Sequence, residues 1–119
     1  MSPAAKSVYY FGFYLYLVSA TLIFIPNILL NTLGIPETNE VWIRVLGVLV
    51  GLIGFYYHQS GAKNISAFFP LTIPTRIVVL LSFIVFAVLK MASPMLVGFG
   101  VIDFAGATWT MMALRKNIN

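Results

Sequence analysis

The chain has 119 residues, of which 61% are hydrophobic and only 8% charged, and its mean hydropathy is +0.98. A soluble domain carries about 25% charged residues, and one this short could not keep so much apolar surface away from water. The composition therefore excludes an ordinary soluble domain and indicates a single integral membrane domain over residues 1–119. The net charge of +4 does not indicate nucleic-acid binding, because the basic residues are scattered at the edges of apolar runs, where they match lipid phosphates.

The first apolar run covers residues 8–30 and is long enough to cross a bilayer, which takes about 20 helical residues. Lys6 and the small residues around Ser19 resemble a cleavable signal, but the run continues without charge to Leu30, so we expect a retained span. Pro26 should kink or end this helix. A polar connector then follows over residues 31–40.

Three further spans are predicted at about residues 41–57, 75–91 and 95–114. The connector over 58–74 contains an apolar piece, 65–69, that is too short to cross and should lie in the headgroup region. The runs lack the two-residue alternation of a membrane barrel. The expected fold is therefore an all-α, four-transmembrane-helix bundle.

The distribution of Lys and Arg predicts the orientation. In a four-span arrangement the basic residues outside the spans fall mostly on one side, whereas Glu37 and Glu40 fall on the other, and only Lys90 clearly opposes the pattern. Both termini should therefore face the cytoplasm, in a cell inner (plasma) membrane.

Asp103 lies near the middle of the fourth predicted span. An ionised carboxylate there costs about 2.5–3.5 kcal/mol on insertion scales, so it must be protonated, hydrated or paired. It is either a functional group, for example in a proton relay, ligand site or ion site, or half of a structural ion pair. Arg44 is the expected partner and Arg76 the rival, because both enter the bilayer at a similar offset in depth.

Small residues form a stripe on the second predicted span at helical spacing. The stripe consists of Gly47, Gly51 and Gly54, between Arg44 and His58. Glycines allow close approach of helices in lipid, so a packing seam is the favoured interpretation, with a slot for a flat ligand as the alternative. We expect this seam to pack against Gly106 and Ala107 of the fourth span.

Other polar side chains could reach a central intramembrane site. Tyr16 and Ser19 lie deep in the first span, and Thr110 shares a helical stripe with Asp103 and Gly106. His58, the one histidine, is expected to be an interfacial residue. We identify no catalytic pair, nucleotide-binding loop or cluster of metal ligands, so neither enzymatic activity nor a cofactor is predicted.

Short motifs carry a family resemblance. They are Val41-Trp42-Ile43-Arg44-Val45-Leu46-Gly47, Pro74-Thr75-Arg76 and Gly100-Val101-Ile102-Asp103. In these motifs, with Gly51 and Gly54 after the first, the chain resembles the DoxX-like families of small four-helix bacterial membrane proteins. The resemblance implies a bacterial inner-membrane protein, of a family in which some members are accessory subunits of larger systems, without a defined set of catalytic residues.

Two functions follow as hypotheses. The first is a non-enzymatic accessory or ligand-binding bundle whose partners are membrane lipids, a lipophilic small molecule or a larger membrane complex. The alternative is a small homo-oligomeric transporter with Asp103 as its coupling group.

Overall fold

The computed structural model describes residues 1–118, and these form helices and connecting turns without any β-strand. The elements are α1 (Pro3–Phe24), α2 (Pro26–Thr32), α3 (Trp42–Ala62), the 3-10 turn η1 (Phe69–Leu71), α4 (Thr72–Val88) and α5 (Met95–Ile118). Three helical stretches are long and apolar enough to cross a membrane: Pro3–Phe24, Phe69–Val88 and Met95–Lys116. Helix α3 has 21 residues and is long enough to cross a membrane, but it is not one of these three stretches. Arg44 near its start and His58 near its end lower its hydropathy.

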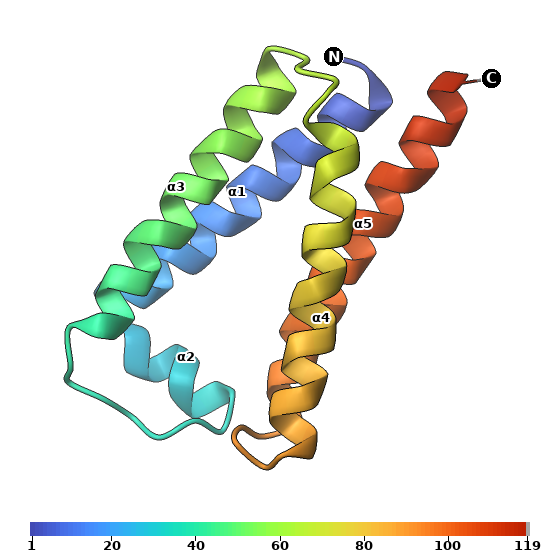
Figure 1. Cartoon of the computed structure of the whole chain (residues 1–119). Helices are drawn as coiled ribbons and strands as arrows, with labels where there is room; N and C mark the ends of the chain where they lie inside the picture. Colours follow the sequence, from blue (N-terminus) through green and yellow to red (C-terminus); the bar gives the residue numbers. More distant parts are fainter. Residues whose placement is uncertain (119) are drawn as a thin grey trace.

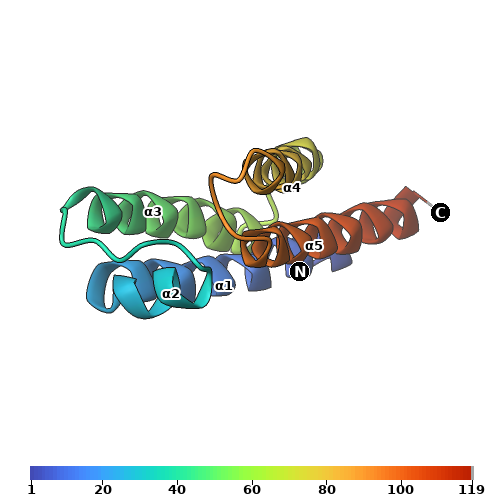
Figure 2. The ribbon, with the colours of Figure 1, turned by 90° about the horizontal axis from the view of Figure 1, so that it is seen from below.

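The helices are arranged as two antiparallel pairs (Figure 1). Helix α3 packs along α1, α5 packs along α4, and contact between α1 and α5 joins the pairs. Seen from below, α1 and α3 lie side by side, with α4 and α5 next to them (Figure 2). The molecule is consequently flat, with extents of 47 × 28 × 17 Å.

The expected seam between the second and fourth spans is wrong, because the glycines of α3 lie against α1. A Cβ atom on Gly47 would meet Leu22, one on Gly51 would meet Ser19, and one on Gly54 would lie 3.1 Å from the carbonyl oxygen of Gly12. The approach is close because α1 also places small residues on the facing side. Glycine therefore serves close helix packing, as expected, but with a different partner.

Pro26 ends the first helix, as predicted. Proline has no N–H to continue the helical ladder, and α1 stops at Phe24, after which Ile25 leaves helical geometry and α2 begins. The start of α1 is equally well defined, because the Ser2 side chain accepts a hydrogen bond from the N–H of Ala5 and caps the helix.

The segment between α3 and α4, predicted to lie at headgroup level, packs partly into the protein core. Ile65 is exposed, but Phe69 is only 1% exposed and packs with Ala4, Ala5 and Val8 in the main core. This core lies at the end of the molecule that carries both termini (Figure 1). It holds α1, α5 and η1 together at that end.

Candidate functional site

A cavity of about 580 Å³ lies between the two helix pairs. Its volume is within the range of small-molecule pockets, about 300–1,000 Å³. Every long helix contributes to its wall, and most of the lining is apolar. The aromatic side chains in this lining are Phe11, Tyr14, Tyr56, Tyr57, Phe68, Phe83 and Phe99.

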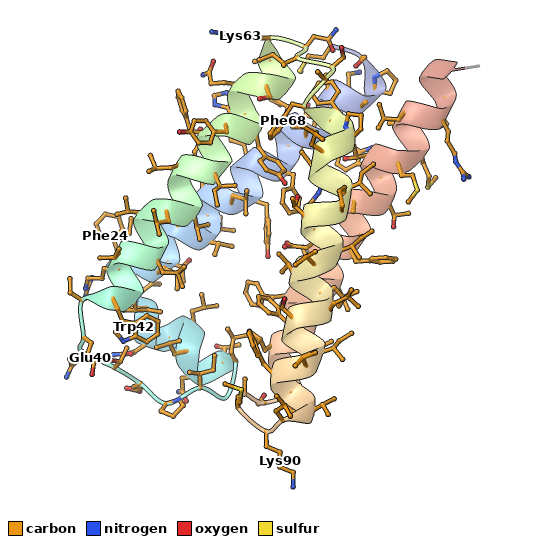
Figure 3. All side chains as sticks on the ribbon, in the orientation of Figure 1. Phe24, Glu40, Trp42, Lys63, Phe68 and Lys90 are labelled. Carbon is orange, nitrogen blue, oxygen red and sulfur yellow. The ribbon has the colours of Figure 1, made fainter. Side chains whose placement is uncertain are left out.

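The cavity extends between α3 and α4, which make no extensive contact with each other in the described part of the chain. Phe68 stands at the upper end of the space between these two helices (Figure 3). Val50 and Ile53 line the cavity from α3, and Val79 and Phe83 line it from α4. The cavity therefore lies at the gap between α3 and α4.

Arg76 is the principal polar group of the cavity wall, and it is only 2% exposed. Its Nε donates to the carbonyl oxygen of Thr72 at 3.0 Å, and its Nη2 donates to the hydroxyls of Thr72 at 2.6 Å and Thr110 at 2.8 Å. The guanidinium carbon also lies 4.8 Å from the ring centroid of Phe11, a cation–π distance. These contacts fix a buried cation in one orientation.

The hydrogen bonds of Arg76 continue into α1. The hydroxyls of Thr110 and Ser7 are 2.7 Å apart, and Ser7 donates its own proton to the carbonyl oxygen of Ala4. Thr110 is therefore the donor to Ser7. This chain of bonds links α4, α5 and α1 at the position where the two helix pairs meet.

One donor of Arg76 has no partner. Its Nη1 is the one buried side-chain nitrogen or oxygen without a hydrogen bond among the described residues. The missing side chain of Gly106 gives Nη1 its space, because a Cβ atom there would lie 3.0 Å away. A buried donor of a charged group is costly to leave unsatisfied, so the hydrogen bonds around Arg76 do not fully compensate the burial of its guanidinium.

Asp103 lines the same cavity as Arg76, one turn before Gly106 on α5. No ion pair within 4.0 Å joins it to Arg76, and no side-chain partner is found for its carboxylate within residues 1–118. The cavity thus contains one cation and one carboxylate that do not touch each other.

The predicted pairing of Asp103 with Arg44 is wrong. Arg44 lies outside this cavity and donates instead to the carbonyl oxygen of Ile23 in the last turn of α1. The reason is the helix pairing: α3 packs on α1, so Arg44 reaches the end of α1 that Pro26 interrupts. A cation there also complements the negative end of the helix dipole.

Three other predicted residues also lie away from the cavity lining. Ser19 donates to the carbonyl oxygen of Gly47 at 2.6 Å and so belongs to the α1–α3 seam. The hydroxyl of Tyr16 is 3.1 Å from Nδ1 of His58. The ring of His58 also packs against Tyr9 and Phe13.

Sequence reasoning missed several residues of the site. Thr72 and Ser7 complete the bonds around Arg76, and Tyr14 and Tyr57 bring aromatic rings to the wall. The spacing of Thr72 and Arg76, four residues apart on one helix, was the one available signal.

Within residues 1–118, no three His, Asp or Glu side chains are grouped so that they could hold a metal ion. No family model matches the chain, and no curated protein or solved structure is detectably similar to it.

Proposed function

We propose that this protein is a small, non-enzymatic integral membrane protein that binds a lipophilic ligand taken from the bilayer. The observation that carries the proposal is the apolar cavity of about 580 Å³ between the helix pairs, with Arg76 and Asp103 in its wall. Cavities that are mostly apolar and contain a few polar groups are typical of ligand sites. The gap between α3 and α4 lies on the side of the molecule that lipid would cover.

The proposal includes four crossings, with α3 added to the three helical stretches that are long and apolar enough on their own. Its 21 residues extend about 31 Å, close to the thickness of a bilayer's hydrocarbon core. The proposed location is a bacterial inner membrane with both termini in the cytoplasm. Lys63 lies at the end that carries the termini and Glu40 at the opposite end, which supports this orientation (Figure 3).

Labelling of introduced cysteines tests the orientation, because the chain has no cysteine of its own. In intact cells an impermeant maleimide should label Thr38→Cys and should leave Lys63→Cys and Lys116→Cys unlabelled. The reverse pattern would refute the orientation but would leave the ligand-binding proposal standing.

Filling the cavity tests the binding proposal. Val79 lines the cavity, whereas its neighbour Val78 is 58% exposed on the outer side of α4. Native mass spectrometry of the detergent-extracted protein should show bound lipophilic molecules on the wild type and on Val78→Trp. It should show far fewer on Val79→Trp. Equal occupancy of the two tryptophan variants would contradict a ligand site in this cavity.

The second candidate function is a small oligomeric transporter in which Asp103 couples substrate to protons. The observation that favours it is a carboxylate without an ion pair on the wall of an intramembrane cavity. Flux in proteoliposomes that Asp103→Asn abolishes would support transport. Co-purification with a larger complex, without flux, would support the accessory role to which the DoxX-like resemblance points; that resemblance stays a prediction.

A further inference from the structure

A second pocket lies at the end of the molecule opposite the termini, where α1 ends and α3 begins (Figure 1). Its volume is about 260 Å³, and most of its wall is polar, in contrast to the central cavity. The break at Pro26 forms one side of it, and the connector before α3 forms the other. Arg44 and Glu40 both line this small space, so it carries one positive and one negative side chain.

Two hydrogen bonds hold the connector beside the pocket. The backbone N–H of Thr38 donates to Oδ1 of Asn27 at 2.9 Å, and the N–H of Glu40 donates to the hydroxyl of Thr38 at 3.0 Å. The first bond fastens the connector to the first turn of α2, and the second fixes the backbone of Glu40 itself. Glu40 is therefore held at the pocket although it lies in an irregular segment.

The two charges of the pocket do not neutralise each other. Arg44 donates through one guanidinium nitrogen to the carbonyl oxygen of Ile23, and no ion pair joins it to Glu40 within residues 1–118. The other N–H groups of Arg44 remain available for an anion, as does the side-chain amide nitrogen of Asn27. Arg44 and Glu40 are both exposed, so a ligand can reach them. The wall thus offers donors for an anion beside an acceptor for a cation.

The surroundings of the pocket match the boundary between hydrocarbon and head groups in the proposed four-crossing arrangement. Figure 3 shows Phe24, Trp42 and Glu40 one after another towards the end of the molecule. Phe24 and Ile28 are strongly exposed apolar side chains, and both line the pocket. Trp42, exposed at the start of α3, is of a residue type enriched at membrane interfaces. A polar pocket at this level would meet lipid head groups, with apolar side chains next to it for the lipid chains.

We propose that this pocket binds the head group of a zwitterionic phospholipid, with its phosphate held by Arg44 and Asn27 and its ammonium held by Glu40. Phosphatidylethanolamine has such a head, in which a short ethylene link separates the two charges. An anionic head without an ammonium would satisfy Arg44 but would bring its phosphate close to the carboxylate of Glu40. A zwitterionic head satisfies both side chains without adding net charge.

The test is native mass spectrometry of the delipidated full-length protein, titrated with dioleoyl phosphatidylethanolamine or dioleoyl phosphatidylglycerol. The two lipids share their chains and their phosphate, but only the ethanolamine lipid has an ammonium. The wild type should bind it about fivefold more tightly, the factor that one exposed ion pair of about 1 kcal/mol supplies. Soluble phosphoethanolamine has no chains and should not compete at equal concentration. If it competes as well as the lipid, the pocket takes a soluble ligand and the proposal is wrong.

Substitutions at Glu40 should change this preference without disturbing the fold, because the side chain is exposed. Glu40→Gln should make the two affinities nearly equal, and Glu40→Lys should reverse their order. Glu37→Gln is the matched control, because it removes the same charge from the same connector at a position that does not line the pocket. It should keep the wild-type preference. Arg44→Met should weaken the binding of both lipids by a similar factor.

The central cavity could also take up lipid, and filling it separates the two sites. Val79→Trp should keep the preference for the ethanolamine lipid, because Val79 lines only the central cavity. If this variant loses the preference, the head group is recognised in the cavity and the inference fails. It fails as well if the wild type binds both lipids equally, or if Glu37→Gln acts as strongly as Glu40→Gln. These last two results would leave the proposed function of the central cavity standing.

Discussion

Replacing Thr110 by valine tests the polar junction between the helix pairs. Thr110 is fully buried and valine has nearly the same shape, so the change removes a hydroxyl without opening a cavity. Two hydrogen bonds are lost: the one from Nη2 of Arg76 at 2.8 Å and the one to Ser7 at 2.7 Å. A bond to a charged group contributes about 1.5–3 kcal/mol and a neutral one about 0.5–1.5 kcal/mol. The free energy of unfolding should therefore fall by about 2–4 kcal/mol.

The same chemical change on the same helix supplies the control. Thr108 donates only to the carbonyl oxygen of Phe104 in its own helix, at 3.0 Å. Thr108→Val should therefore cost less than about 1 kcal/mol. Reversible unfolding in mixed micelles of mild detergent and dodecyl sulfate, followed by circular dichroism, measures both. Thr110→Ser keeps the hydroxyl and should recover most of the loss. If Thr110→Val and Thr108→Val lose the same free energy, the junction does not stabilise the fold as argued.

Two further predictions concern helix packing and the corrected role of Arg44. Gly12→Leu should destabilise the protein severely in a detergent melt, because even a Cβ atom there would lie 2.8 Å from a backbone oxygen of α3. Gly98→Leu is the control. A Cβ atom at Gly98 meets open space, so this variant should melt close to the wild type. Arg44→Met should lower the melting temperature modestly, because the carbonyl oxygen of Ile23 loses its donor. The losses of unfolding free energy from Arg44→Met and Asp103→Asn should add within about 0.5 kcal/mol in the double variant. Strong coupling between the two substitutions would instead favour the Arg44–Asp103 ion pair and contradict the structure.

The hydrophobic runs predicted the all-helical class and the break at Pro26, because both depend on properties local to the chain. The partners of the helices were not predictable in the same way. The glycines of α3 show that one face is closely packed, but Gly12 and Ser19 on α1 suit that face as well as Gly106 on α5 does. Spacing along one helix contains no information about which neighbour it meets.

The same limit applies to the site. Arg44 and Arg76 had similar offsets from Asp103, and only the pairing of α4 with α5 places Arg76 on the same cavity as Asp103, although without an ion pair. The cavity had no sequence signal at all. In water a buried face stands out as apolar, but in lipid the outer surface is apolar too, so residues such as Phe99 and Val50 resemble ordinary lipid-facing positions.

The contact between two turns at the end opposite the termini has a kinetic consequence. Gly34, with a positive φ of 70°, lies against Ser93 so closely that a Cβ atom would be 2.6 Å from that of serine. This contact joins the turn after α2 to the turn before α5, and so holds the helix pairs together where α1 and α5 no longer do. Any side chain at Gly34 would spread the turns and widen the gap between α3 and α4. For a cavity ligand of the kind proposed above, the residence time should therefore shorten, while Arg76 and Asp103 would stay in place.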